Sequence, residues 1–231
     1  NAAASANGLL LYSSANPLSQ LKWFDRTGKP LGILGDPGQY EMFRRSPDGR
    51  RVVFALNRQG GSDLWLMDVE RGVASRFASR PGLNWWPIWS PDGRNIVFGS
   101  GVSNPRDLFR EEVSGAGGGE HLLPPTETLK GPLDWSQDGR WVLYFEIVAG
   151  TQRDLWVMPV TPDGKTAAGA QPKPYLRTPA SEWQGRFSPE LNSSSGPRWV
   201  AYQSDESGRN EVYINSFPEA RAKTRISVTG G

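Results

Sequence analysis

Short stretches of apolar or alternating residues, separated by turn-forming residues, run along the whole chain of 231 residues. In one representative region the stretches are about 40–46, 51–57, 63–69 and 74–78. Stretches of this length with period-two alternation are typical of β-strands. No segment of ten or more residues has a convincing helical period. The pattern therefore predicts an all-β chain with many short strands and essentially no helix.

One tight-turn motif recurs and divides the chain into repeats. A serine is followed by proline or glutamine, then by an acidic residue and, in three copies, by glycine and an apolar strand. Proline sets φ for the first central position, aspartate bonds nearby backbone, and glycine takes the left-handed conformation. The copies begin at Ser46, Ser90, Ser136 and Ser188, which are 44, 46 and 52 residues apart, and the fourth is interrupted from Leu191 to Gly196.

A second motif follows each turn and places an aromatic residue two positions after an acidic one. Its aromatic residues are Trp65, Phe109, Trp156 and Tyr213, and a second aromatic row before the turns consists of Trp89, Trp135 and Phe187. A four-stranded sheet cannot bury both of its faces alone. We therefore expect the two aromatic rows to fill the wedges between neighbouring sheets.

A period in the mid-forties with four strands in each repeat is typical of a β-propeller blade. We predict one β-propeller domain over residues 1–231, with five four-stranded repeats. Their approximate bounds are 8–35, 39–79, 83–124, 128–178 and 182–228. The first repeat begins at Gly8 to Ser13, which reads as a second strand, so we expect its innermost strand to be missing.

The two motifs together resemble the TolB-like propeller repeat, a relative of the WD repeat. The residues that carry the resemblance are 90–94, read Ser-Pro-Asp-Gly-Arg, and 154–158, read Asp-Leu-Trp-Val-Met, with their other copies. In this family the repeats occur in periplasmic TolB, in peptidase-associated propellers and in sensor-like C-terminal domains of bacterial protein kinases. The resemblance implies a propeller fold and an extracytoplasmic location, although no targeting signal is visible in the chain.

The charge balance and the residue content exclude several classes of function. The chain has 26 Lys and Arg against 24 Asp and Glu, so its net charge is only +2, which gives no strong attraction for nucleic acid. It has no cysteine, which removes disulfides, thiol nucleophiles and cysteine-bound zinc. Its longest clean apolar run, Leu9 to Tyr12, is far too short to span a membrane.

Residues for catalysis are scarce. A Ser-His-Asp triad needs a histidine or a substitute base, and the only histidine is His121, in a segment that reads as an outer strand. We expect no enzyme activity and no cofactor. The repeated aspartates Asp48, Asp92 and Asp138 are explained by the turns, and a calcium site built from loop aspartates stays open as an alternative.

The entry to the innermost strand of each blade is the best candidate for a binding surface, because these loops converge on one mouth of the central channel. Mixed polar and aromatic residues on converging loops suit recognition. The position two residues before each turn serine is predicted to line the channel itself, and it holds Arg44, Ile88, Asp134 and Arg186. The candidate ligand-binding residues are Tyr40, Glu41, Arg44, Trp85, Trp86, Asp134, Glu182, Trp183 and Arg186.

Two functions of different classes remain open. The first is a non-catalytic recognition module that binds a protein, a peptide or a small ligand at the channel mouth, as a sensor or scaffold domain of a larger bacterial protein. The second is the propeller of a hydrolase or peptidase that gates access to a catalytic domain outside this chain. No nucleic-acid partner and no membrane insertion are expected in either case.

The ring is expected not to close in the usual way, in which one blade takes strands from both chain ends. We expect the natural protein to continue past Gly231 to six or more blades. In this chain the inner edge of the first repeat should then be open, covered by residues 1–7, or paired with a second copy, since unpaired strand edges invite pairing.

Overall fold

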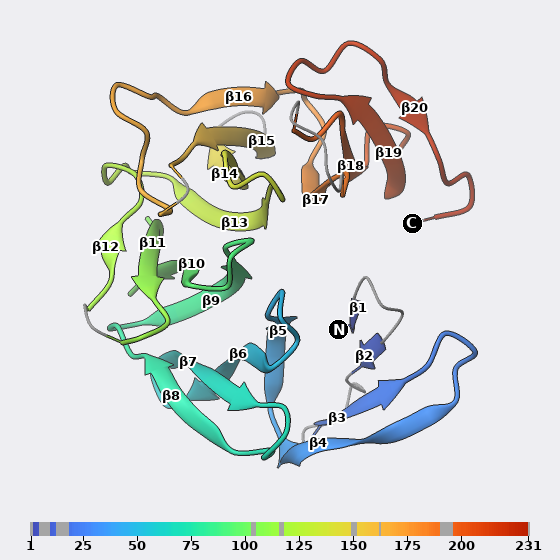
Figure 1. The fold of residues 1–231 in the computed structure, drawn as a ribbon. Helices are drawn as coiled ribbons and strands as arrows, with labels where there is room; N and C mark the ends of the chain where they lie inside the picture. Colours follow the sequence, from blue (N-terminus) through green and yellow to red (C-terminus); the bar gives the residue numbers. More distant parts are fainter. Residues whose placement is uncertain are drawn as a thin grey trace.

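The computed structural model describes residues 2–4, 10–12, 19–102, 105–115, 118–148, 152–161, 163–189 and 196–230, with the backbone alone at 2–4 and 10–12. The described residues form strands, turns and loops (Figure 1). They contain no helix, and so no helix that is long and apolar enough to cross a membrane. The interrupted fourth turn, at 190–195, lies outside the described residues.

The described strands form five antiparallel sheets of four strands each, which we call blades 1 to 5. Blade 1 consists of β1 (Ala2–Ala4), β2 (Leu10–Tyr12), β3 (Ser19–Phe24) and β4 (Pro30–Gly38). Blade 2 consists of β5 (Tyr40–Arg45), β6 (Arg51–Arg58), β7 (Gly61–Asp68) and β8 (Ala74–Ala78). Blade 3 consists of β9 (Leu83–Trp89), β10 (Asn95–Gly101), β11 (Asp107–Glu112) and β12 (Glu120–His121).

Blade 4 consists of β13 (Leu129–Trp135), β14 (Trp141–Val148), β15 (Gln152–Pro159) and β16 (Lys173–Leu176). Blade 5 consists of β17 (Glu182–Phe187), β18 (Trp199–Ser204), β19 (Glu211–Ser216) and β20 (Thr224–Arg225). In every blade the four strands follow one another in chain order, and the blades are arranged around a common centre (Figure 1). The prediction of an all-β propeller with five four-stranded repeats is confirmed.

The expectation that blade 1 lacks its innermost strand is wrong. Strand β1 pairs antiparallel with β2, with Ala3 opposite Leu11, so all four strands of this blade come from this chain. Of the three arrangements expected for this edge, the one covered by residues 1–7 is therefore found. An edge strand is held through its backbone groups, which every residue carries. Three consecutive alanines have neither an alternating pattern nor a turn motif, so periodicity gave no sign of this strand.

The recurring turns are built as their sequence predicts. In the first, the Ser46 hydroxyl donates to Asp48 Oδ1 at 2.6 Å, and the Arg50 backbone N–H donates to the same oxygen at 3.0 Å. The hydroxyl of Ser46 holds the pKa of the Asp48 carboxyl below its usual value, and the Arg50 N–H adds to this effect. Gly49 has a φ of 74°, which a glycine adopts without strain. The turns at Ser90 and Ser136 repeat the same serine–aspartate hydrogen bond.

The hydrophobic core lies between the blades. Each of four buried clusters combines the facing sides of two neighbouring blades. Trp89 of blade 3 packs with Val53 and Leu64 of blade 2, and Trp135 of blade 4 packs with Val97 of blade 3. The prediction that the aromatic rows fill the wedges between sheets is therefore confirmed.

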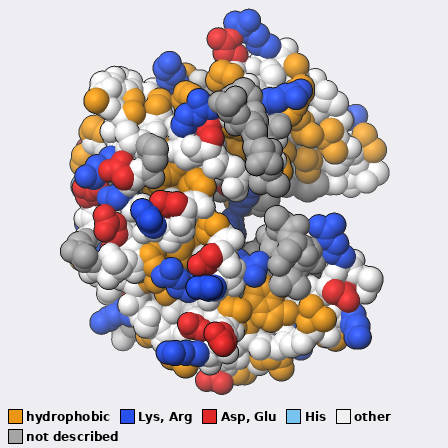
Figure 2. Space-filling view, in the orientation of Figure 1, with side chains coloured by type: hydrophobic (Ala, Val, Ile, Leu, Met, Phe, Trp, Pro, Cys, Tyr) orange, Lys and Arg blue, Asp and Glu red, His pale blue; other side chains and the backbone are white. Residues whose placement is uncertain are grey.

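The ring has an opening between blade 5 and blade 1. The ribbon is C-shaped, and the space-filling view has a notch on the same side (Figures 1 and 2). On blade 5 the side chain of Val212 is only half-buried, whereas the three residues at the matching position of blades 2 to 4 have an exposed fraction of 0%. These three residues are Leu64, Leu108 and Leu155. Among the described residues, the face of blade 5 that turns toward the notch thus has less cover than the other blades give one another.

Two valine substitutions measure the difference between a covered and an uncovered blade face. Val97→Ala, in the core between blades 3 and 4, should lower the free energy of unfolding by about 2 kcal/mol, because it removes buried methyl groups and leaves a cavity. Val212→Ala should cost less than about 1 kcal/mol. Chemical denaturation followed by tryptophan fluorescence gives both values. An equal cost for the two substitutions would mean that the notch is covered in solution.

Candidate functional site

Two tryptophans and an arginine meet where the innermost strand of blade 3 begins. The rings of Trp85 and Trp86 on β9 are edge-to-face with their centroids 5.5 Å apart. The guanidinium of Arg106, just before β11, lies 5.1 Å from the Trp85 ring centroid and 5.9 Å from that of Trp86. Burial lowers the pKa of Arg106. Cation–π contacts of this kind are attractive, and they hold the half-buried rings in place.

A second pair of the same kind joins blades 4 and 5. The guanidinium of Arg153 on β15 lies 5.1 Å from the ring centroid of Trp183 on β17. Arg106 and Arg153 were not among the residues predicted for the site. The sequence repeats could have indicated these two arginines, because each directly precedes the acidic residue of the second motif, Asp107 or Asp154.

Three charged residues of the inner strands lie within electrostatic reach of one another at the channel. Arg44 on β5 and Arg186 on β17 both act on the carboxyl of Asp134 on β13, and the charge of Arg186 acts on Arg44. All three side chains are half-buried. The expectation that this row lines the channel does not hold for its fourth member, Ile88, which packs in the core between blades 3 and 4.

Three of the inner strands have an irregular backbone at the same place. Met42, Trp86 and Gln184 occupy the same place in β5, β9 and β17, and they have φ values of 50°, 54° and 53°. In each strand the pairing register shifts at this place, as in a β-bulge. A bulge resets the alternation of side chains between the two faces.

Three other predicted residues hydrogen-bond to neighbouring parts of the chain. Tyr40 is 8% exposed, and its hydroxyl donates to the Asp36 carbonyl at 2.5 Å. Glu41 is half-buried and accepts a hydrogen bond of 2.9 Å from the Asn57 amide. Glu182 is 1% exposed and accepts a hydrogen bond from the Thr178 hydroxyl. Of the predicted set, the tryptophans, Glu41 and the three channel residues therefore retain the larger access to solvent.

Glu182 is an unusual carboxyl because its second oxygen, Oε2, is buried without a hydrogen-bond partner among the described residues. Burial raises its pKa to about 7, against the hydrogen bond from Thr178, and the nearby carboxyl of Asp154 raises it further. The protonation of Glu182 at neutral pH is thus coupled to the fold.

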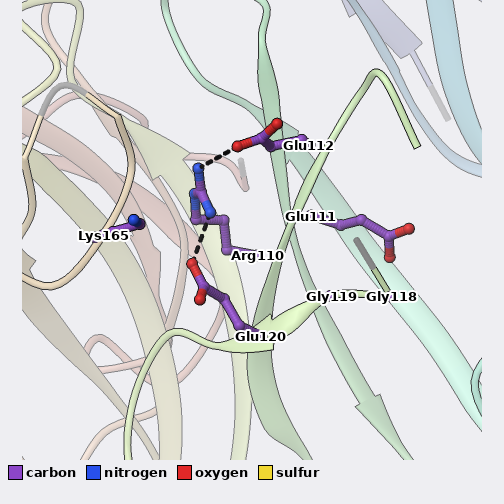
Figure 3. Close-up of a pocket in the computed structure, with 7 residues that line it drawn as sticks. All are labelled: Arg110, Glu111, Glu112, Gly118, Gly119, Glu120 and Lys165. Atoms are coloured by element: carbon purple, nitrogen blue, oxygen red, sulfur yellow. Dashed lines mark hydrogen bonds and ion pairs between the residues drawn. The ribbon is translucent and has the colours of Figure 1, made fainter. Parts of the chain in front are cut away.

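A pocket of about 460 Å³ lies away from the channel, at the outer part of blade 3. In Figure 3 the buried Arg110 points between Glu120 and Glu112, while Glu111 points to the other side of β11. The Arg110 guanidinium forms ion pairs of 2.6 Å with Glu120 and 3.5 Å with Glu112. None of the nine predicted ligand-binding residues lines this pocket.

The described residues hold no group of three histidine, cysteine, aspartate or glutamate side chains placed to bind a metal ion. His121 lies on the outer strand β12, exposed, with its ring centroid 4.2 Å from that of Phe109. This position agrees with the outer strand expected from the sequence.

Replacing Glu182 should change how stability depends on pH. The folded-state pKa is raised above the unfolded value of about 4.3, so wild-type stability should fall as pH rises from about 4 through 7. Glu182→Gln removes the buried ionisable carboxyl, so the variant should gain stability over wild type on the order of 1–3 kcal/mol at pH 8 and little at pH 4. Urea denaturation at both pH values measures the difference. A stability difference that is independent of pH would contradict the assignment.

Comparisons with known proteins place this geometry among other propellers. No family model matches the chain. An uncharacterised protein of Agrobacterium fabrum is 35% identical over 71 residues, which are 31% of this chain and 24% of that protein. Dipeptidyl-peptidase 5 of Porphyromonas gingivalis is 23% identical over 154 residues, 56% of this chain and 22% of the peptidase. The matches thus span less than a quarter of the length of these curated relatives.

Solved structures cover nearly the whole chain. TolB from Acinetobacter baumannii superposes with a TM-score of 0.79 at 18% identity, over 100% of this chain and 54% of that one. A putative TolB from Agrobacterium tumefaciens gives 0.75 at 18% identity, over 97% and 78%. A puromycin hydrolase gives 0.68 at 16% identity, over 98% and 38%. At these identities the likeness is one of fold, and the chain has the TolB-like β-propeller fold.

Proposed function

We propose that this chain is a non-catalytic recognition domain whose channel mouth binds a segment of a protein or a peptide, as a sensor or scaffold within a larger bacterial protein. One observation carries the proposal. Two tryptophan–arginine stacks, Trp85 with Arg106 and Trp183 with Arg153, lie where the inner strands of blades 3 and 5 begin.

The chemistry of these stacks suits recognition. Tryptophan and arginine are enriched among the residues that dominate binding energy at protein interfaces. Both rings are half-buried, so each keeps a surface that a ligand can cover. An arginine guanidinium already contacts each ring before a ligand binds. The tryptophan and arginine side chains therefore lose less conformational freedom on binding, which favours affinity.

The proposal that the chain has no catalytic activity rests on its residue content. The chain has one histidine, and that histidine lies on an outer strand beside Phe109. The resemblance to TolB supports the further proposal of an extracytoplasmic location, which cell fractionation of the natural host protein would test.

A second candidate function is favoured by the likeness to dipeptidyl-peptidase 5 and to the puromycin hydrolase. In this alternative the chain is the propeller of a peptidase and controls access to a catalytic domain elsewhere in the protein. The full-length protein separates the two functions. Hydrolysis of peptide substrates by the full-length protein would support the alternative.

Removing Trp183 should weaken binding at the channel mouth. Peptides selected against the chain from a random display library serve as probes. Trp183→Ala should weaken their binding by about tenfold or more, since truncating a central tryptophan typically costs at least 2 kcal/mol. Isothermal titration calorimetry measures the affinity, and circular dichroism checks that the variant is folded.

Trp199→Ala is the matched control. Trp199 begins β18, at the turn end of blade 5 and away from the entry loops, and it is 36% exposed. Its loss should leave the affinity within about twofold of wild type. Equal affinity in wild type and Trp183→Ala, or equal weakening by the two substitutions, would show that the channel mouth is not the binding surface.

A further inference from the structure

Two arginines and one aspartate of the channel come from three different blades. Arg44, Asp134 and Arg186 each stand two residues before a turn serine, on the inner strands β5, β13 and β17. Figure 2 shows Lys or Arg side chains at the inner end of the notch between blades 1 and 5. The three side chains together carry more positive than negative charge.

Each guanidinium is anchored to backbone through one of its nitrogens. Arg44 Nη1 donates to the Phe43 carbonyl at 2.9 Å. Arg186 Nη1 donates to the Gly185 carbonyl at 2.9 Å and to the Leu133 carbonyl of the neighbouring blade. These bonds fix the orientation of the side chains. Nε and Nη2 of each arginine form no hydrogen bond with the described residues.

Asp134, the carboxylate that acts on both arginines, forms no ion pair with either of them in the part of the chain that the structure describes. Asp134 Oδ2 accepts the backbone N–H of Phe187 at 2.8 Å, which ties it to blade 5. Among the described residues, the ion pairs with N–O distances up to 4.0 Å include neither Arg44 nor Arg186. Asp134 therefore offsets the two positive charges from a distance.

The two arginines repel one another. Burial lowers the pKa of Arg44 to about 10, and the charge of Arg186 lowers it further, against the opposite effect of Asp134. Burial also raises the pKa of Asp134, against the charge of Arg186, its hydrogen bonds from backbone N–H groups and the charge of Arg44. An added anion would relieve this repulsion.

We infer that Arg44 and Arg186 form a receptor for a single carboxylate of a bound peptide. The inference rests on the proposed function and names the group that the channel recognises. Guanidinium forks match the planar carboxylate and bind it through paired charge-assisted hydrogen bonds. Two arginines and one aspartate leave one net positive charge, which a carboxylate neutralises and a phosphate dianion exceeds.

A set of small probes tests the site on the folded chain by NMR titration at low ionic strength, where charge interactions are least screened. The first probe is an acetylated, amidated pentapeptide with one central glutamate, and the second has glutamine in its place. The third is the glutamine peptide with a free C-terminal carboxylate, and the fourth is inorganic phosphate. We expect the glutamate peptide to bind about tenfold more tightly than the neutral glutamine peptide. Tighter binding of the third probe than of the first would identify a chain terminus as the preferred source of the carboxylate.

Three substitutions in this group should change the affinity for the carboxylate peptide, two by weakening it and one by tightening it. Arg44→Gln and Arg186→Gln should each weaken the binding of the carboxylate peptide by about tenfold. Asp134→Asn should tighten it, because the competing negative charge is removed. Arg221→Gln is the charge-matched control, since Arg221 pairs with Glu219 and its side chain is 81% exposed. It should leave the affinity unchanged.

Arg186→Lys provides the decisive variant if Arg186→Gln does not fold. Lysine keeps the charge and loses the fork, so binding should weaken relative to wild type. Binding of the neutral glutamine peptide as tight as that of both carboxylate peptides would overturn the inference. So would binding of phosphate in preference to both carboxylate probes, or weaker carboxylate binding in Asp134→Asn.

The library-selected peptides separate this inference from the proposed function. If their affinity depends on Trp183 and not on Arg44 or Arg186, the carboxylate receptor is wrong and the recognition surface stands. If their affinity depends on the arginines and not on Trp183, the carboxylate receptor stands and the tryptophan stacks are not the binding surface.

Discussion

Burial of each sheet against its neighbours is the interaction on which the rest of this structure depends. Both faces of a central blade are apolar, and residues such as Val53, Leu108 and Leu143 are fully buried only because another blade lies against them. Each such side chain contributes roughly 1.5–3 kcal/mol. The wedge-shaped cores set the angle between blades, and that angle brings inner strands from distant parts of the sequence to a common channel.

The repeats made most of this predictable. A turn motif and an aromatic motif, each recurring at nearly constant spacing, indicated the number of sheets, the strands within them and the residues between them. The proximity of Arg44, Asp134 and Arg186 follows for the same reason, because a residue at a fixed place in a repeat lies at a fixed place in a blade. Only Ile88 departs from it, and an apolar side chain at that place gains more from the neighbouring core.

What could not be predicted depends on irregular backbone and on contacts between blades. Strict alternation places Tyr40 and Phe43 on opposite faces of β5, yet both lie in the core between blades 1 and 2, because the bulge at Met42 resets the pattern. The contact of Arg153 with Trp183 joins residues of different blades. The repeats mark the position of the arginine, and the packing of one blade against the next decides which ring it meets. The residues six positions before the turn serines, at the start of the inner strands, also differ in their partners. Asn84 bonds to Ser62 and Ser100, Lys130 pairs with Asp107, and Glu182 accepts from Thr178.

The bulges of the inner strands have a consequence for how this protein can evolve. Met42, Trp86 and Gln184 hold a left-handed backbone that costs a residue with a side chain about 1 kcal/mol relative to glycine. Glycine would relieve this cost at each position and would also remove the side chain, which at Trp86 packs against Trp85 and Phe145. At the exposed Gln184, selection for a higher melting temperature alone would therefore favour glycine. At Trp86 it would not, because losing a packed aromatic ring costs about 3–5 kcal/mol, more than the strain that glycine relieves.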